Sequence, residues 1–266
     1  AIMIDLHAHI LPGIDDGAAD LATSLELARQ YVVAGFETVV ATPHARVGGF
    51  SKASAQAVRD SVDRLNRALR ANAIDLNVLP VMEVDLDGSL AQHVADGAVI
   101  PLACKNHLLV ERPFLQMPLG WQNMLYDLES CGMTVIFAHP ERCAQLMEKP
   151  HLLEEMAGRG VRLQVNWSSL AGFHGSHVQR LAGHMARQGL IHCVGTDCHD
   201  PVSRPPGLAI DGARVLSGLV DRDDLDRIVH DNPQRVVEGL PLQLPGLENT
   251  ASQAPEPCAW WRRLVS

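Results

Sequence analysis

The sequence predicts an α/β fold of about seven successive strand–helix units. Short apolar segments rich in valine, isoleucine and leucine alternate with longer amphipathic segments along the chain. The apolar segments lack a regular alternation of polar and apolar residues, which is typical of strands buried on both faces of a parallel sheet. The length of 266 residues suits a single α/β barrel. The repeated units therefore indicate either a barrel or a doubly wound parallel sheet.

Seven segments are expected to form the strands of this fold. They comprise residues 2–6, 37–41, 77–82, 107–110, 134–137, 162–165 and 193–195. Helices are expected between them, where apolar residues recur three or four positions apart. Such sets begin at Leu21, Val58, Trp121 and Val178. The Asn232-Pro233 step predicts an N-cap followed by a proline in the first position of a final helix.

The composition excludes several classes of protein. Hydrophobic residues make up 47% and charged residues 20%, so the chain can bury a large core and is not disordered as a whole. The formal net charge of −9 implies no broad basic surface, and we expect no nucleic-acid partner. No apolar run reaches the roughly 20 residues of a transmembrane segment, and the first residues lack a signal-peptide pattern. The six cysteines contain no C-x-x-C pair, which favours reduced thiols and a cytoplasmic location.

The composition changes near residue 240. Residues 1–240 contain all the expected strand–helix units, whereas residues 241–266 are rich in proline and polar residues and are expected to form a linker and tail. Trp260 and Trp261 precede two arginines, a pattern that can anchor a partner or a membrane surface. The same residues could instead dock back onto the fold or belong to a frayed end, and we favour this second interpretation.

Histidines and carboxylates follow the C-terminal ends of six expected strands. They are His7, His9, His44, Glu83, Glu111, His139, Asp197 and His199. In a barrel, the C-terminal ends of all strands meet at one mouth, where active sites lie. Residues i and i+2 share one face of a strand, so each of the H-x-H and D-x-H pairs can point into that mouth. One pair is a weak signal, but agreement at six strand ends predicts a metal centre.

These residue types also indicate the metal. Imidazole and carboxylate groups without paired thiolates suit Mn²⁺, Fe or Zn²⁺, and they disfavour a structural zinc–cysteine site. An ion usually takes three or four protein ligands, so this set is large enough for two or three ions.

Five segments of the chain carry a specific resemblance. HILPGIDDGA completes the H-x-H pair, and ATPH, LLVE, AHPER and TDCHDPVSRPP follow in this order. They closely resemble the manganese-dependent protein tyrosine phosphatases of bacteria, the CpsB/YwqE group of the PHP superfamily. The resemblance covers roughly residues 3–240. It implies a distorted (β/α)7 barrel of the PHP fold, with three divalent metal ions, manganese foremost, at the C-terminal ends of the strands.

The resemblance also assigns residues by position. The first ion would be held by His7, His9, Glu83 and Asp197, the second by Glu83, Glu111 and His139, and the third by Asp16, His44 and His199. Arg142 and Arg204 resemble the arginines that bind phosphate in this group. Either Asp15 or Asp16 could point inward, and the motif favours Asp16.

The implied reaction is the metal-dependent hydrolysis of protein phosphotyrosine. The implied substrate is a bacterial tyrosine kinase that controls capsule or exopolysaccharide synthesis. Clustered cations lower the pKa of water and so supply a nucleophile at neutral pH, while the two arginines would hold the phosphoryl group. The sequence leaves the general acid open between a water molecule and a nearby histidine.

Four further residues are expected to support the site or to line its pocket. Asp5 is expected to orient an adjacent histidine through a hydrogen bond. Glu141 could act in the same way or begin a helix. His174 and His177 follow the sixth expected strand and could line the pocket.

Several other functions stay open. A histidinol-phosphate or other small-molecule phosphatase of the superfamily would use the same metal residues, and a non-catalytic phosphotyrosine-binding module would use the same pocket. The negative charge disfavours a nuclease. Cys198 and Arg204 have the C-x5-R spacing of cysteine-dependent tyrosine phosphatases. That loop lacks glycine and contains Pro201, so we interpret the spacing as chance.

Overall fold

The structure is a computed structural model that describes residues 3–45, 53–102, 107–111 and 115–245. Within these residues, the strands form two parallel sheets. The first has the order β1–β2–β4 and contains β1 (Met3–Ala8), β2 (Phe36–Ala41) and β4 (Asn77–Pro80). The second has the order β3–β5–β6–β7–β8–β9 and contains β3 (His44–Ala45), β5 (Glu83–Asp85), β6 (His107–Glu111), β7 (Thr134–Ala138), β8 (Arg162–Asn166) and β9 (Cys193–Gly195).

The α/β class and the seven expected strand segments are confirmed, but one of those strands ends earlier than expected. The strand expected over residues 77–82 ends as β4 at Pro80, and β5 begins at Glu83 in the other sheet. Backbone pairing continues across this break, because the Val81 N–H donates to the Ala41 carbonyl at 3.0 Å and the Glu83 N–H donates to the Pro43 carbonyl at 3.2 Å. The very short β3 and β5 give no apolar pattern of their own.

The edge strands β1 and β9 meet at their C-terminal ends. Ala8 and Cys198 form a parallel bridge. The Asp197 N–H donates to the His7 carbonyl and the His9 N–H donates to the Cys198 carbonyl, both at 2.9 Å. These bonds bring the H-x-H and D-x-H pairs together from opposite ends of the sequence.

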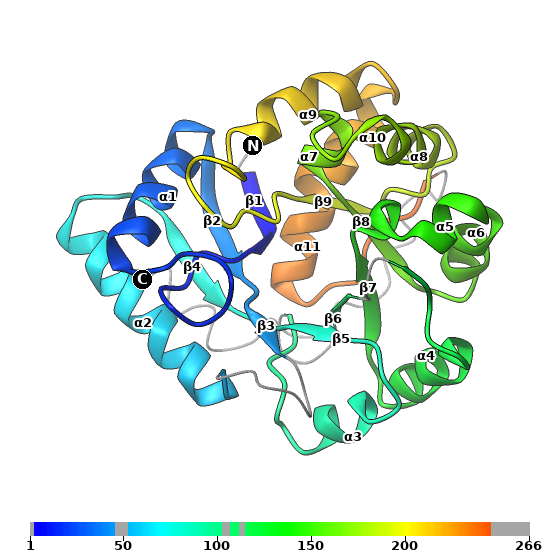
Figure 1. Cartoon of the computed structure of the whole chain (residues 1–266), viewed down its shortest axis with the longest axis horizontal. Coiled ribbons are helices and arrows are strands. Elements are labelled where there is room, and N and C mark those ends of the chain that lie inside the picture. The colour runs from blue at the N-terminus through cyan, green and yellow to red at the C-terminus, as the bar shows by residue number, and fades with distance from the viewer. Residues whose placement is uncertain (1–2, 46–52, 103–106, 112–114, 246–266) are drawn as a thin grey trace.

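Helices surround the strands (Figure 1). In the described part of the chain they are α1 (Leu21–Val33), α2 (Ala55–Ala71), α3 (Leu90–Ala95), α4 (Trp121–Ser130), α5 (Ala144–Glu148), α6 (His151–Gly158), α7 (Trp167–Leu170), α8 (Ser176–Arg187), α9 (Leu208–Ser217), α10 (Arg222–Asp226) and α11 (Asn232–Glu238). The four expected sets of apolar residues correspond to α1, α2, α4 and α8, so these predictions are confirmed.

The N-cap role expected for Asn232 is wrong. A π-helix over Arg227–Asp231 leads directly into α11, and Asn232 has helical backbone angles (φ −67°, ψ −44°). Its buried side chain instead donates to the His192 carbonyl at 2.7 Å and accepts from the Gln243 N–H at 2.6 Å. Leu242 is also buried, so residues 241–245, the start of the expected linker, pack on the fold. The remaining tail with Trp260 and Trp261 lies outside the described residues.

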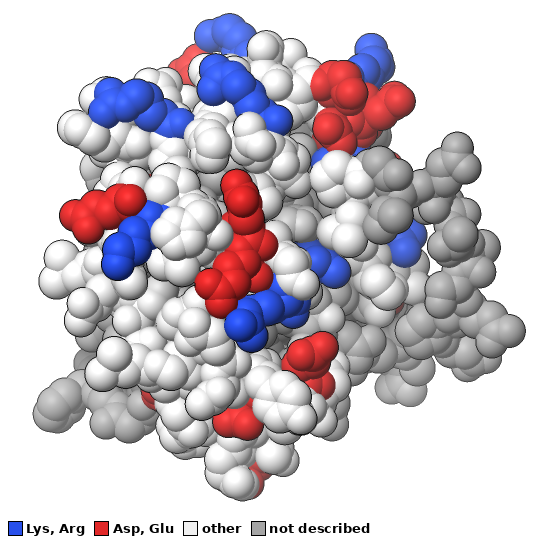
Figure 2. Space-filling model, turned by 90° about the vertical axis from the view of Figure 1, so that its right-hand side faces the viewer, with Lys and Arg blue, Asp and Glu red and all other residues white. Residues whose placement is uncertain are grey.

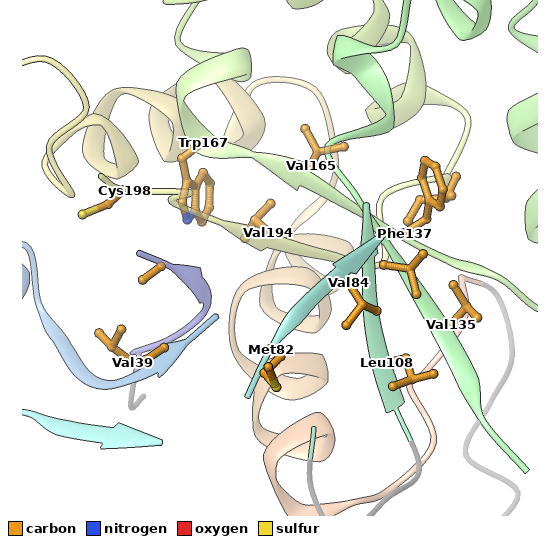
Figure 3. Packing of buried hydrophobic residues seen from close by; sticks show 14 of the residues in the cluster. Val39, Met82, Val84, Leu108, Val135, Phe137, Val165, Trp167, Val194 and Cys198 are labelled. Atoms are coloured by element: carbon orange, nitrogen blue, oxygen red, sulfur yellow. The ribbon is translucent and has the colours of Figure 1, made fainter. Parts of the chain in front are cut away.

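Alternate strand residues pack into two apolar clusters. One cluster joins the strands to the surrounding helices and includes Val39, Leu108, Val135, Phe137 and Val194 (Figure 3). The other includes Val40, Leu109, Ile136, Cys193 and, from α11, Val236 and Val237. Both faces of the strands are therefore buried, which explains the missing polar–apolar alternation.

One face of the molecule carries charges of both signs. On the face that carries α4, α5 and α6, acidic and basic side chains are interspersed among uncharged ones (Figure 2). None of the helices in the described ranges has the length and apolar character needed to cross a membrane.

Candidate metal centre

His7 and His9 are buried at the end of β1, and the hydrogen bonds of their Nδ1 atoms fix their tautomers. A register shift between Asp5 and Ala8 interrupts the pairing of β1 with β2 at this point. His7 Nδ1 lies 2.9 Å from Gln164 Oε1, and His9 Nδ1 lies 2.7 Å from Asp15 Oδ2. Both partners are acceptors, so each Nδ1 carries the proton and each Nε2 presents a lone pair.

The orientation of the Gln164 amide follows from a chain of hydrogen bonds. Gln164 Nε2 donates to Asn166 Oδ1 at 2.9 Å, and Asn166 Nδ2 donates to Asp197 Oδ2 at 2.8 Å. A carboxylate only accepts, so Asn166 must present its nitrogen to Asp197 and its oxygen to Gln164. Gln164 then has only its oxygen left for His7.

The two Nε2 lone pairs face each other and two carboxylates. The Nε2 atoms of His7 and His9 are 3.3 Å apart. Glu83 oxygens lie 3.2 and 3.3 Å from these two atoms, and Asp197 Oδ1 lies 3.5 Å from both. Glu83 Oε2 also lies 3.1 Å from His44 Nδ1. Two Nε2 atoms and two carboxylates that converge in this way need protons or a shared cation between them, and this donor set fits a divalent metal ion.

The candidate ligands of the centre form four overlapping groups. Possible ligand atoms lie within 4.8 Å of one another in four groups, namely His7–His9–Asp197, His7–Glu83–His139, His44–Glu83–Glu111 and His9–Asp16–His44–His199. All nine residues expected as metal ligands are thus brought together in candidate metal-binding clusters. Glu83 and several histidines belong to two groups each, so neighbouring ions could share them. The expected division of the ligands among three ions stays a prediction.

Asp15 and Asp16 have different surroundings. Asp15 accepts from His9 Nδ1 and, at 3.1 Å, from the His44 N–H. Asp16 Oδ1 instead faces His44 Nε2 at 3.4 Å and His199 Nε2 at 3.5 Å. The loop that carries them packs tightly against the residue that follows β1, because a Cβ atom on Gly17 would lie 2.1 Å from the His9 carbonyl oxygen.

Two of the candidate ligands have a left-handed backbone. His139, after β7, has a φ of +35°, and Asp197, after β9, has a φ of +51°. This conformation is unfavourable for residues other than glycine, and it persists only where the surrounding structure enforces it. Both residues lie where the chain turns out of a strand at the candidate centre.

Arg142 and Arg204 converge on one carboxylate oxygen. Arg142 Nη1 lies 2.8 Å and Arg204 Nη2 2.5 Å from Asp197 Oδ2. Asp197 therefore divides its oxygens, with Oδ1 toward the histidines and Oδ2 toward the arginines and Asn166. Two guanidinium groups beside a candidate cation cluster form a suitable site for a phosphoryl group.

The electrostatics of the centre show its surplus of negative charge. Burial lowers the pKa of His9, but hydrogen bonds to carboxylates, Asp15 first, raise it well above the usual value. Burial likewise opposes charge on His44, yet the hydrogen bond to Glu111 and those to other carboxylates raise its pKa to about 10. Burial would raise the pKa of Asp197, but His7 and other positive groups hold it well below the usual value. Cations that replace these protons would neutralise the same carboxylates.

Asp5 and Glu141 are both hydrogen-bonded to the backbone near the candidate ligands. Asp5 accepts from the Tyr31 hydroxyl at 2.7 Å and from the Thr196 N–H at 2.9 Å, and it reaches His7 only through the backbone N–H at 3.3 Å. Asp5 thus holds the adjacent His7 through its backbone, and its role as an orienting partner stays a prediction. Glu141 is buried and accepts from the Asn166 N–H at 3.0 Å.

Cys198 does not face the mouth. Its side chain is fully buried in the apolar cluster (Figure 3), and burial raises the pKa of the thiol. A cysteine nucleophile needs a lowered pKa and access to substrate. The structure therefore agrees with the interpretation that the C-x5-R spacing is chance. Of the described cysteines, Cys131, Cys143, Cys193 and Cys198 are free.

The sequence pattern missed Gln164 and Asn166. Their Q-x-N spacing matches that of the H-x-H pair, and both side chains are buried beside the ligand candidates. The strand expected over residues 162–165 stops before Asn166, which hid this pattern. Of the two histidines considered as pocket residues, His177 is exposed and His174 is half-buried near Arg142 and Arg204.

Comparison with known proteins assigns the family. A family model described as "Capsular polysaccharide synthesis, CpsB/CapC" matches residues 3–238. The chain belongs to the CpsB/CapC family. The resemblance found in the sequence is thereby confirmed.

Relatives of this CpsB/CapC chain are named tyrosine-protein phosphatases. It is 38% identical over 202 residues to tyrosine-protein phosphatase YwqE of Bacillus subtilis. This alignment covers 76% of this chain and 79% of that protein. It is 23% identical over 244 residues to CpsB of Streptococcus pneumoniae, and this alignment covers 88% of this chain and 98% of that protein.

Solved structures agree with this assignment. A crystal structure from a study of YwqE and CpsB, described as metal-dependent tyrosine phosphatases, superposes with a TM-score of 0.86 at 32% identity and covers 96% of this chain and 99% of that one. Histidinol phosphate phosphatase of Lactococcus lactis has a TM-score of 0.53 at 12% identity over 80% of this chain and 92% of that one. The second likeness shows a shared fold only.

Proposed function

We propose that this chain is a metal-dependent phosphomonoesterase that hydrolyses protein phosphotyrosine. The observation that carries the proposal is that the two oxygens of Asp197 face different groups. Oδ1 faces the Nε2 atoms of His7 and His9, and Oδ2 accepts from Arg142 and Arg204. A site for cations and a site for a phosphoryl anion thus share one carboxylate. The names of the relatives support phosphotyrosine as the substrate.

The proposed centre holds three divalent ions, manganese foremost. His7, His9, Glu83 and Asp197 would hold the first, Glu83, Glu111 and His139 the second, and Asp16, His44 and His199 the third. When bound, divalent cations supply charge neutralisation and lower the pKa of water toward neutrality.

The order of the parallel strands supports a distorted (β/α)7 barrel as the fold that holds this centre. In it, the contacts between β1 and β9 link the edges of the two sheets.

The side chains have distinct tasks in this proposal. Arg142 and Arg204 bind the phosphoryl oxygens through charge-assisted hydrogen bonds, and Asp197 positions both guanidinium groups. Gln164 and Asp15 hold the Nδ1 atoms of His7 and His9, so that the Nε2 atoms of both rings are directed to the cations. A tyrosine phenolate has a pKa near 10 in water, so its departure requires little help from a general acid.

The proposed substrate is a tyrosine-phosphorylated bacterial kinase that controls capsule or exopolysaccharide synthesis. The family description supports the link to capsule synthesis, and the names of the relatives support a tyrosine-phosphorylated protein. The choice of a kinase follows from the resemblance found in the sequence. The cytoplasmic location expected from the cysteines stays a prediction.

The test is phosphate release from a phosphotyrosine peptide, with histidinol phosphate in parallel. Both substrates are assayed before EDTA treatment, after it, and after Mn²⁺ is added back. We expect peptide hydrolysis that EDTA abolishes and Mn²⁺ restores. Peptide hydrolysis that survives complete metal removal would overturn the mechanism. Turnover of histidinol phosphate alone would assign the chain to the small-molecule phosphatases, and peptide binding without phosphate release would assign it to non-catalytic binding modules.

A further inference from the structure

Phe173 is an exposed aromatic side chain near the candidate centre. It lies between α7 and α8, in the segment that follows β8, and is 49% exposed. Its ring packs edge-on against the His174 imidazole, with ring centroids 5.1 Å apart and an angle of 87° between the planes. The Phe173 N–H also donates to the Ser168 carbonyl at 2.9 Å. The ring is therefore held in place although half of it faces solvent.

His174 connects Phe173 to the segment that follows β8. His174 Nε2 lies 3.1 Å from Ser168 Oγ, which fixes the imidazole on α7. Burial and the positive charges of Arg142 and Arg204 lower the pKa of His174 to about 4, so the ring is neutral at pH 7. Ser168 lies two residues after Asn166, whose Nδ2 donates to the Asp197 oxygen that also holds Arg142 and Arg204. His174, bound to Ser168, therefore lies at the end of β8 that carries the proposed phosphoryl site, and Phe173 lies against His174.

The shape of phosphotyrosine makes this position significant. Its phenyl ring is bonded directly to the ester oxygen, so a phosphoryl group held by Arg142 and Arg204 leaves the ring against the adjacent wall of the site. We propose that Phe173, positioned by His174, forms that wall, packs against the phenyl ring and makes the site prefer aryl phosphates over alkyl phosphates. The inference rests on the proposed function and adds a residue that determines its specificity.

Other exposed apolar side chains fit this role less well. Tyr126 is the other aromatic residue among the large exposed hydrophobic side chains of the described residues. It lines a groove with Thr134 and Val135 at the start of β7, the end of that strand opposite His139. The exposed Leu115, Leu119 and Val202 have no ring to stack on a phenyl group. An aromatic pair adds a favourable contact beyond the burial of area alone.

The experiment compares two inhibitors that differ only in the group on phosphorus. Phenylphosphonate and methylphosphonate compete with a phosphotyrosine peptide for the Mn²⁺-loaded full chain carrying Phe173→Ala, Phe173→Trp or the control Val33→Ala. Val33 is exposed at the end of α1 and lies outside the candidate centre. Bound metal is measured for each variant, which separates loss of the ring from damage to the centre.

Phe173→Ala is expected to weaken inhibition by phenylphosphonate about two- to tenfold. Inhibition by methylphosphonate should stay at the level of the control, and Phe173→Trp should restore much of the aryl preference. Equal inhibition by phenylphosphonate in Phe173→Ala and Val33→Ala, in a wild-type enzyme that hydrolyses phosphotyrosine, would overturn this inference alone. A wild type that does not hydrolyse the peptide would instead overturn the proposed function, and this inference with it.

Discussion

Gln164 Oε1 accepts the Nδ1 proton of His7 at 2.9 Å, and the orientation of this amide depends on Asp197 through Asn166. One candidate ligand thus determines which nitrogen of another is free to bind a metal ion. Hydrogen-bond partners of this kind fix the ring orientation of metal-binding histidines and raise their basicity. The relationship joins β1, β8 and the turn after β9, and it leads to the first prediction.

Replacement of Gln164 by leucine is expected to weaken Mn²⁺ binding about 10- to 100-fold. The substitution leaves His7 Nδ1 without its acceptor, so the ring can rotate or change tautomer. Metal affinity is measured by Mn²⁺ titration followed by electron paramagnetic resonance. Gln122→Leu on α4 is the matched control. Unchanged affinity in Gln164→Leu would refute the role of this hydrogen bond.

Gly195→Ala is expected to disturb the same pair of residues by steric overlap. A Cβ atom at this position would lie 2.8 Å from His7 Cβ and 2.9 Å from Gln164 Nε2. We expect a loss of about 1–3 kcal/mol in the free energy of unfolding and weaker metal binding. Urea denaturation and metal titration check both effects. Gly88→Ala serves as control, since a Cβ atom there meets nothing within 4 Å, and equal behaviour of the two variants would count against the prediction.

Arg204→Ala is expected to lower kcat/KM for a phosphotyrosine peptide about 100-fold while the bound metal is retained. The guanidinium group is proposed to bind the phosphoryl group, so its loss should affect substrate and transition state rather than the cations. Steady-state kinetics and metal analysis are measured together. Arg214→Ala, on the exposed face of α9, is the control. Full activity in Arg204→Ala would exclude a phosphate-binding role.

Cys198→Ala is expected to retain most of the metal-dependent activity. The thiol is buried in an apolar cluster and its pKa is raised, so it cannot attack a substrate. Phosphate release by the variant, with and without EDTA, checks this expectation. Near-complete loss of activity in a folded variant with normal metal content would revive the cysteine mechanism.

The free energy of unfolding is expected to fall as the pH drops from about 6.5 toward 4. Burial, together with the charge of Arg162, lowers the pKa of His107 to about 4 in the folded chain, against 6.5 for an ordinary histidine. Burial and the same arginine lower the pKa of His192 to about 3. The unfolded chain therefore binds protons first, and each histidine contributes a slope of at most about 1.4 kcal/mol per pH unit in this range.

Urea denaturation of the metal-free protein at pH 7 and pH 5 measures this effect. His107→Gln should show a smaller loss between the two pH values than the wild type, because one of the two buried imidazoles no longer titrates. His177→Gln, at an exposed position on α8, should behave like the wild type. A pH dependence of His107→Gln equal to that of the wild type would contradict the assignment.

Part of the structure followed from local sequence patterns. Strands such as β6 and β7 are recognisable because both of their faces are buried, so their central residues are apolar without alternation. Helix α1 is recognisable from its regularly spaced apolar residues and the glycine that follows. The H-x-H and D-x-H pairs are recognisable because strand geometry places residues i and i+2 on one face.

Other features depend on contacts between distant segments. The break between β4 and β5 follows from pairing with β2 and β3, which no pattern within residues 77–85 reveals. Asparagine is a common N-cap residue, but the preceding π-helix occupies the N-cap position of α11. The Asn232 side chain hydrogen-bonds to the backbone of His192 and Gln243 instead. Local preference yields to such tertiary hydrogen bonds when the side chain is buried.

By itself, the sequence determined the α/β class, the family and the residue types of the centre, because these depend on local periodicity and on motifs. Only the tertiary structure decided that Gln164 holds His7, that Asp15 holds His9 while Asp16 faces His44 and His199, and that both arginines meet on Asp197. The physical reason is that a hydrogen bond depends on the distance and direction between two side chains. For residues on different strands, these are fixed only when the parallel strands and the bridge between β1 and β9 bring their ends together.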